Sequence, residues 1–165
     1  MKVIFLDIDG VLNVIAREWD FYGPIFHKHF VENLKTIIDK TGAKLVISST
    51  WRASGIDFMK EMWEFRKLPG EIIDITPTTI EIDETNSHLM DINMFSVERG
   101  YEIKQWLKYN KVDNYVIIDD DTDFLPEQMK NFVQTSENTD HEDCVDLGYG
   151  LTKKCSELVI KILNK

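Results

Sequence analysis

Short apolar runs rich in β-branched residues alternate along this chain with segments whose apolar residues recur at helical spacing. Each apolar run is long enough for one buried strand, and the segments between most of the runs are long enough for a helix. Strands separated by helices favour an α/β fold, in which a parallel sheet carries helices on both faces. The predicted strands are residues 2–8, 44–49, 71–76, 115–119 and 131–135.

Four segments carry the helical spacing. The first is residues 28–41, which Gly42 is expected to end. Ser54 followed by Asp57 resembles a capping box, which predicts that the second helix begins near Ser54. The third helix is predicted at about residues 98–110, and Thr152 is expected to cap the fourth. The remaining long segments, residues 77–95 and 136–147, are predicted to be a loop or small insert and an acidic loop.

The size and composition of the chain are those of one globular domain. It has 165 residues, of which 43% are hydrophobic and 29% are charged. No apolar run approaches the roughly 20 residues that a membrane-spanning helix needs. The first ten residues are too short and too acidic for a signal peptide. We therefore expect a single cytoplasmic domain over residues 1–165, with Cys144 and Cys155 as free thiols.

The formal net charge of −10 bears on the possible partners. A broad nucleic-acid surface needs many lysine and arginine side chains to neutralise phosphates, so such a surface is not expected. A phosphorylated substrate remains compatible with this charge. A bound divalent cation and a few local basic side chains can reverse the sign of the potential inside one cleft.

Polar side chains gather where three of the predicted strands end. Ligands of parallel α/β sheets bind at the carboxyl ends of the strands, so these side chains should converge on one edge. Carboxylates that are crowded together repel each other unless one is protonated or a cation lies between them. Hard oxygen ligands in this number suit Mg²⁺. The converging residues are Asp7 and Asp9 after the first strand, Ser48 and Ser49 after the second, Asp119, Asp120 and Asp121 after the fourth, and Arg99 at the start of the preceding helix.

The first of these groups, Asp7-Ile8-Asp9-Gly10, allows two distinct roles for its carboxylates. One carboxylate can attack phosphorus and form an aspartyl phosphate. A second, two residues further on, can protonate the leaving oxygen and later accept a proton from water. Gly10 would let the chain turn sharply and bring its backbone close to a phosphate. Arg99 and a metal ion could neutralise the phosphoryl oxygens, and the Ser48 hydroxyl could donate a hydrogen bond to one of them.

These segments resemble the four ordered motifs of the haloacid dehalogenase (HAD) superfamily. The motifs are "FLDIDGVLN", "LVISSTWR", an arginine at a helix start and "YVIIDDD", in the expected order over residues 3–121. More narrowly, "SSTWR", "RGYEIKQWL", "VIIDDD", "FVQT" and "GLT" resemble the HAD domain of Swiss-army-knife RNA repair proteins. The resemblance implies a Rossmann-like three-layer sandwich around a five-stranded parallel sheet of order 5-4-1-2-3. It also implies Mg²⁺ and an aspartyl-phosphate intermediate.

The resemblance assigns roles to individual positions. It implies that Asp7 is the nucleophile and a metal ligand, and that Asp9 is the general acid and base and binds the metal through its backbone carbonyl. It implies that Ser48 and Arg99 complete the catalytic set, although Ser49 and Lys104 remain alternatives to them. Asp119 and Asp120 are the expected acidic metal ligands, and the run of aspartates leaves Asp121 and Asp123 open as contributors.

The two residues that end the second motif have two interpretations. Trp51 and Arg52 follow the second strand and could clamp a nucleotide base and phosphate, with Gly10, Ser49 and Arg52 forming the predicted substrate-binding set. Alternatively, Trp51 packs in the core and Arg52 pairs with a surface carboxylate. The four histidines, His27, His29, His88 and His141, show no metal-ligand spacing and are expected to be structural.

We therefore predict a Mg²⁺-dependent phosphatase acting on a small phosphate ester, a nucleotide or a nucleic-acid end. Little or no cap domain is evident, because the segments between the motifs are short or are occupied by core elements. The alternatives are a receiver-type signalling domain and a phosphate-binding domain without turnover. A receiver would need an acceptor aspartate after the third strand and a lysine after the fifth, where this chain has "DITPTT" and "QT". The sequence does not indicate an oligomeric state.

Overall fold

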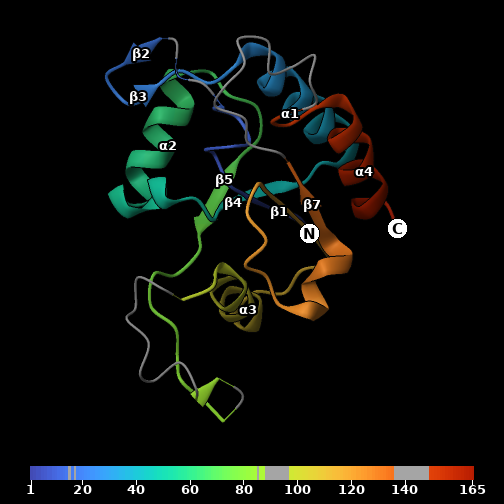
Figure 1. The fold of residues 1–165 in the computed structure, drawn as a ribbon. Helices are drawn as coiled ribbons and strands as arrows, with labels where there is room; N and C mark the ends of the chain where they lie inside the picture. Colours follow the sequence, from blue (N-terminus) through green and yellow to red (C-terminus); the bar gives the residue numbers. More distant parts are fainter. Residues whose placement is uncertain (15, 17, 85, 88–96, 136–148) are drawn as a thin grey trace.

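A five-stranded parallel sheet forms the centre of the protein (Figure 1). The computed structural model describes residues 1–14, 16, 18–84, 86, 87, 97–135 and 149–165. The strands of the sheet are β1 (Lys2–Leu6), β4 (Lys44–Ile47), β5 (Ile72–Ile75), β6 (Asn114–Asp119) and β7 (Phe132–Gln134). Their order is β5-β4-β1-β6-β7, and every neighbouring pair is parallel. Counted in chain order and read from the β7 edge, this is the predicted order 5-4-1-2-3.

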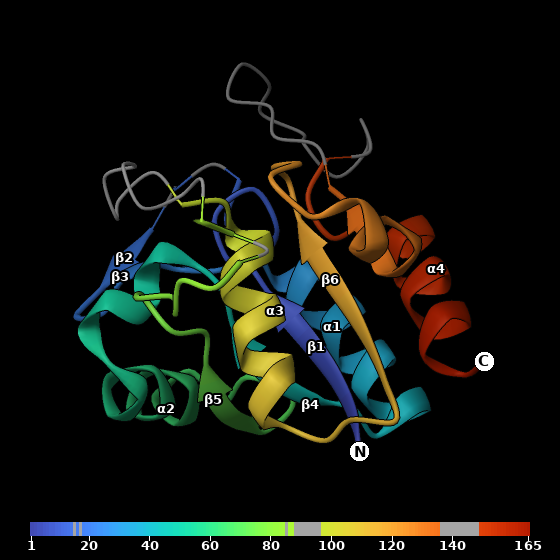
Figure 2. The same ribbon diagram turned by 90° about the horizontal axis from the view of Figure 1, so that it is seen from below.

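Helices cover both faces of the sheet, which gives the predicted three layers (Figure 2). Side chains alternate between the two faces of a strand, so Ile4 and Leu6 of β1 belong to one apolar cluster, and Val3 and Phe5 to another. The first cluster includes side chains of three helices, and the second includes side chains of one. The three helices are α1 (Lys28–Thr41), α2 (Ile56–Phe65) and α4 (Lys153–Leu163), and the single one is α3 (Arg99–Tyr109).

Two of the three predicted helix signals are confirmed. Gly42 ends α1 with φ of 64° and donates its N–H to the Ile38 carbonyl at 2.8 Å. The Thr152 hydroxyl caps α4 by accepting the N–H of Cys155 at 3.2 Å. The capping box at Ser54 is wrong, because Ser54 is the last residue of a short 3-10 helix, Thr50–Ser54, and Gly55 precedes α2. A second 3-10 helix, Pro126–Asn131, precedes β7.

A small antiparallel hairpin between β1 and α1 was not predicted. It consists of β2 (Trp19–Asp20) and β3 (Gly23–Pro24), and it lies beside α2 in both ribbon views (Figures 1 and 2). The Asp20 carboxylate accepts hydrogen bonds from Arg66 at 2.7 and 2.9 Å, just after α2. The Tyr22 and Phe58 rings are in contact, with centroids 5.4 Å apart. Strands of two residues are too short to show a periodic pattern, which is why the sequence does not reveal them.

Several predictions fall on residues 88–96 and 136–148, which lie outside the described residues. They include much of the predicted loop at 77–95, the acidic loop, His88, His141 and Cys144. Cys155 is a free thiol, as expected. Within the described part of the chain, no helix is long and apolar enough to cross a membrane.

Candidate active site

Asp7 directly follows β1 at the carboxyl edge of the sheet. Its backbone N–H donates to the Ile118 carbonyl of β6 at 3.0 Å, so its position is held by the adjacent strand. On the other side, the N–H of Ser48 donates to the Leu6 carbonyl at 3.0 Å. Asp7 is only 4% exposed. The central strand and its two neighbours therefore place this carboxylate in a buried position between their ends.

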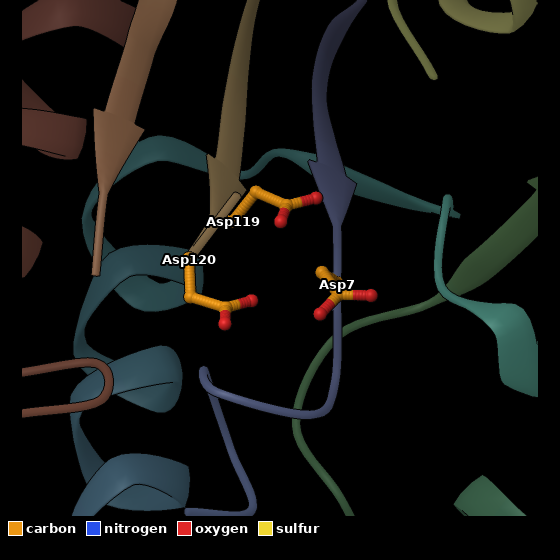
Figure 3. Close-up of side chains that lie close together, drawn as sticks. All are labelled: Asp7, Asp119 and Asp120. Carbon is orange, nitrogen blue, oxygen red and sulfur yellow. The ribbon is translucent and has the colours of Figure 1, made fainter. Parts of the chain in front are cut away.

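Three carboxylates converge at this edge: Asp7, Asp119 at the end of β6, and Asp120 immediately after it (Figure 3). One oxygen from each lies within 4.8 Å of the others. Asp119 is fully buried, and Asp120 is partly buried. Three hard oxygen donors this close, with the buried pair withdrawn from water, fit the donor set of a divalent cation such as Mg²⁺. The sequence expectation that Asp7, Asp119 and Asp120 lie together agrees with this arrangement.

Gly10 makes the approach of Asp120 possible. Its φ of 72° lies in the left-handed region, and a Cβ at this position would overlap the Asp120 carboxyl group. The Gly10 carbonyl accepts a hydrogen bond from the Thr135 hydroxyl at 2.8 Å. The turn after Asp7 is thus packed against the end of β6 and the end of β7. The group that requires a glycine at position 10 in the structure is therefore the Asp120 carboxylate.

Arg99 is the basic residue that faces these carboxylates. It is the first residue of α3, and its Nη1 lies 2.7 Å from Asp119 Oδ2 and 3.3 Å from Asp7 Oδ1. Its Nη2 contacts Asp121 at 2.6 Å, and its Nε contacts Asp123 at 3.3 Å. Lys104, the alternative cation, is exposed further along α3 and lines a different pocket with Glu81.

The run of aspartates divides into two groups. Asp119 and Asp120 form the cluster with Asp7, and Asp119 also contacts Arg99, whereas Asp121 and Asp123 contact Arg99 without belonging to the cluster. Asp123 also accepts the backbone N–H of Arg99 at 3.0 Å, so it satisfies a free donor at the start of α3. Asp121 is exposed. The geometry therefore favours Asp119 and Asp120 as metal ligands and gives Asp121 and Asp123 the task of positioning Arg99.

Burial dominates the electrostatics of the two innermost carboxyl groups. Burial raises the pKa of Asp7 to about 7, although the positive charge of Arg99 and a hydrogen bond from Ser49 oppose the shift. Burial, followed by repulsion from Asp7, raises the pKa of Asp119 to about 8, with Arg99 again opposing. Burial works against the charge of Arg99, but the surrounding carboxylates outweigh it and raise the pKa of the guanidinium. Arg99 alone therefore does not neutralise the negative charge of the carboxylate cluster. A bound cation would neutralise more of this charge.

The two serines after β4 have different surroundings. Ser49 hydrogen bonds the Asp7 carboxylate, and its hydroxyl oxygen accepts the N–H of Trp51 at 3.5 Å. The Ser48 hydroxyl is fully buried and has no hydrogen-bond partner among the described residues. Ser49, the alternative, is therefore the serine that contacts the Asp7 carboxylate, whereas the Ser48 hydroxyl is an uncommitted donor whose catalytic role stays a prediction.

Asp9 is exposed and separate from the three-carboxylate cluster. Its Oδ2 accepts the indole N–H of Trp51 at 2.9 Å, and its Oδ1 accepts the side-chain amide of Asn13 at 3.0 Å. The Trp51 ring also has the Phe26 ring at 5.5 Å and the Arg66 guanidinium at 5.8 Å. Trp51 thus lies at the site, where it orients Asp9; much of its ring is packed against other side chains.

Arg52 points away from the carboxylates and into the interior. It is 8% exposed, and its Nη2 contacts both carboxylate oxygens of Glu102 at 2.6 and 2.7 Å. Its Nη1 donates to the carbonyls of Ser48 at 2.7 Å and Ser49 at 2.8 Å. Arg52 is paired with a buried carboxylate, where the sequence suggested a surface one, and its binding of substrate stays a prediction. The Arg52 guanidinium therefore connects the loop after β4 to α3 and stabilises the position of both beside the site.

Sequence reasoning missed Asn13 and Glu102. Asn13 lies in the tight turn after Gly10 and reaches back to Asp9, and polar side chains in such turns commonly bond nearby groups. Glu102 is one helical turn beyond Arg99, and burial raises the pKa of its carboxyl group while Arg52 opposes the shift. Helical spacing could have identified Glu102 as a neighbour of Arg99. It could not have identified Arg52 as the partner of Glu102, because Arg52 lies in a distant loop.

A family model for the HAD domain in Swiss Army Knife RNA repair proteins matches residues 3–140. The chain belongs to this family. The match includes Asp7, the serines after β4, Arg99 and the aspartates after β6, and it supports a hydrolase of the phosphatase type for this HAD domain. No curated protein and no solved structure matches the chain.

Proposed function

We propose that this HAD domain is a Mg²⁺-dependent phosphomonoesterase that uses Asp7 as its nucleophile. The observation that carries the proposal is the convergence of Asp7, Asp119 and Asp120 at the carboxyl edge of the sheet, with Arg99 in contact with the first two. A receiver-type domain is less compatible with this arrangement and with the family. Membership of the HAD family adds support that does not depend on the geometry.

The first step transfers the phosphoryl group to the protein. A carboxylate oxygen of Asp7 forms a bond to phosphorus while the bond between phosphorus and the ester oxygen breaks. Arg99 stabilises the negative charge of the phosphoryl oxygens, and Ser48 donates a hydrogen bond to one of them. Asp9 gives its proton to the departing oxygen, so the leaving group departs as a neutral alcohol.

The second step releases inorganic phosphate. Asp9, now a carboxylate, accepts a proton from a water molecule as the water oxygen bonds to phosphorus. The bond between phosphorus and Asp7 breaks, and the Asp7 carboxylate is restored. Trp51 and Asn13 hold the Asp9 carboxylate through both oxygens, which keeps it oriented for both proton transfers.

Asp7, Asp119 and Asp120 are the residues that would hold Mg²⁺ through their side chains, and the Asp9 backbone carbonyl is the further ligand that the family resemblance implies. The ion would neutralise the crowded carboxylates and the phosphoryl oxygens. Gly10 leaves room for the Asp120 carboxylate to take part.

The substrate we propose is a small phosphate ester, a nucleotide or the phosphorylated end of a nucleic acid. The family description refers to RNA repair, which favours the last two. The net charge of −10 argues against a broad nucleic-acid surface, so the recognition should be local to the phosphorylated end.

Hydrolysis of an aryl phosphate by the purified protein tests the proposal. Asp7→Asn should abolish turnover with the fold intact, as checked by circular dichroism, and Asp39→Asn on the exposed side of α1 is the matched control. EDTA should stop the reaction and Mg²⁺ should restore it. Asp9→Asn should slow the second step, so that intact-mass spectrometry detects a phosphoryl adduct.

Turnover retained by Asp7→Asn would rule out Asp7 as the nucleophile. Activity that is insensitive to EDTA would remove the metal from the mechanism.

A further inference from the structure

A cavity of about 350 Å³ opens beside Arg99, on the side of the site formed by β4, β5 and α3. We propose that this cavity binds the leaving group of the substrate, and that it selects an uncharged, hydroxyl-bearing ring group about the size of one nucleoside or sugar. The inference rests on the proposed phosphatase function and adds a substrate class to it. Its polar and charged lining residues are Thr50, Arg52, Thr78, Arg99, Glu102 and Asp123.

The cavity is continuous with the site because they share residues. Arg99 lies between the two: its Nη1 is 3.3 Å from the nucleophile Asp7, and the same side chain lines the cavity. Thr50 follows Ser49, which hydrogen bonds Asp7. A phosphoryl group held between Asp7, Ser48 and Arg99 therefore has this cavity as a neighbouring space for its ester substituent.

The charges of the cavity argue against a second phosphate. Its four charged side chains are two arginines and two carboxylates, so their formal charges cancel. The positive charges of both guanidiniums face carboxylates, and of these two groups the Arg52 Nε is the buried donor that has no partner among the described residues. Arg52 contacts both oxygens of Glu102 at 2.6 and 2.7 Å, and Arg99 contacts Asp119 and Asp121 at 2.7 and 2.6 Å. An additional anionic group would meet no positive charge without a carboxylate partner among the described lining residues, and its burial would be unfavourable.

The rest of the lining fits a group that is neither charged nor purely apolar. The Thr50 and Thr78 hydroxyls can donate or accept hydrogen bonds, while Ala53 and Val97 offer apolar contact. Ligand cavities are typically about 300–1,000 Å³, so this one is near the lower limit and suits one ring-sized group. A nucleoside or a sugar has this chemistry, and the remainder of a nucleic-acid strand would have to extend outside.

The test compares kcat/KM for esters that share the phosphate and differ in the leaving group. The wild-type protein should hydrolyse a nucleoside 5′-monophosphate or ribose 5-phosphate at least tenfold better than methyl phosphate. The ester with the higher kcat/KM of these two shows whether the cavity binds a nucleoside or a sugar. A nucleoside 3′,5′-bisphosphate should be at least tenfold worse than the 5′-monophosphate, because both arginines of the described lining are already paired with carboxylates.

Thr78→Leu narrows the cavity, and Thr79→Leu is its matched control, because Thr79 is also exposed and does not line the cavity. Thr78→Leu should lower the preference for the ring ester over methyl phosphate at least tenfold, mainly by raising KM for the ring ester. Thr79→Leu should keep the wild-type preference. Ala53→Leu, on a different segment, is a second narrowing variant in case Thr78→Leu does not fold.

The outcomes separate this inference from the proposed function. If the wild-type protein hydrolyses no ester, the phosphatase proposal fails, and this inference fails with it. If it hydrolyses esters but prefers the bisphosphate, or if Thr78→Leu and Thr79→Leu have equal preferences, the phosphatase proposal stands and the leaving-group cavity is refuted. The wild-type protein could also prefer a 5′-phosphorylated oligonucleotide to the monophosphate. If Thr78→Leu had the same preference, the proposed role of the cavity would be refuted.

Discussion

Two arginines, Arg99 and Arg52, each connect α3 to the carboxyl edge of the sheet, but the charges around them differ. Arg99 is the first residue of α3 and is surrounded by the carboxylates of Asp7, Asp119, Asp121 and Asp123 at the edge of the sheet. Arg52, in the loop after β4, is more deeply buried and meets a single carboxylate, Glu102, together with two backbone carbonyls. Arg99 faces an excess of negative charge, whereas the charge of Arg52 is balanced.

The difference shows how the surroundings of a cation separate a candidate catalytic residue from a positioning residue. An arginine with more carboxylates than it can neutralise lies where a metal ion and a phosphoryl group could complete the charge balance. An arginine with one buried carboxylate and two carbonyls as partners has its charge balanced without a ligand. Both arginines belong to the quoted motifs, so their sequence positions alone do not distinguish them.

The largest effect on stability is expected from Arg52. Arg52→Met leaves Glu102 buried without its partner, which should lower the free energy of unfolding by about 3–5 kcal/mol, as measured by urea denaturation. The double variant Arg52→Met/Glu102→Leu should recover most of this loss, because it removes both charges. Lys35→Met, which breaks the exposed pair with Asp39, is the control and should change stability little.

A different result would assign Arg52 to the substrate. If Arg52→Met were as stable as Lys35→Met and instead raised KM for nucleotides alone, Arg52 would act as the phosphate clamp that the sequence suggested.

Arg99 should affect catalysis more than stability. Arg99→Met should lower kcat/KM by about 10²–10³, as expected when a group that stabilises transition-state charge is removed. Lys104→Met is the matched control, because Lys104 is a cation on the same helix that does not contact the carboxylate cluster; its kcat/KM should stay close to wild type. Equal losses in both variants would show that the effect comes from α3 as a whole.

The carboxylates around Arg99 should make the metal-free protein less stable as the pH rises. The pKa of Asp119 is about 8 in the folded state and 3.8 for an isolated side chain. The folded state therefore holds this proton more tightly, and stability is lost as the pH rises from about 4 through about 8. Asp119→Asn does not titrate, so in EDTA it should be more stable than wild type at pH 8.5, by about 1–3 kcal/mol, with a smaller difference at pH 5.

Thermal unfolding at the two pH values measures this difference. Asp121→Asn is the control, because Asp121 also contacts Arg99 but is exposed. A gain for Asp119→Asn that is the same at both pH values would show that titration of Asp119 is not its cause.

Trp51 should give the smallest effect and should sharpen the contrast with its neighbour Arg52. Trp51→Phe keeps an aromatic ring but removes the N–H that donates to Asp9, which should lower kcat about five- to tenfold with KM nearly unchanged. Trp63→Phe is the matched control, because its indole donates to the Pro69 carbonyl at 3.0 Å, away from Asp9. It should lower stability without lowering kcat. A rise in KM for nucleotides alone would instead support base stacking on Trp51.

The elements with a strong periodic signal could be predicted from the sequence, and the shorter ones could not. The five strands of the sheet were located to within two residues at each end because their apolar runs are continuous. The β2–β3 hairpin escaped because its strands have two residues each, and its stability comes from Asp20 pairing with the distant Arg66. The capping box at Ser54 failed for a similar reason, since Ser54 joins the preceding 3-10 helix.

The sequence by itself determined the family, the parallel sheet and the acidic and basic residues that follow its strands. Those features are local, because an apolar run and the polar residues after it are contiguous in the chain. Only the tertiary structure decided that Asp119 and Asp120, and not Asp121 or Asp123, form the cluster with Asp7, and that Arg52 binds Glu102 fifty positions away. These choices depend on side chains meeting across separate elements, where burial and charge compensation select the partner.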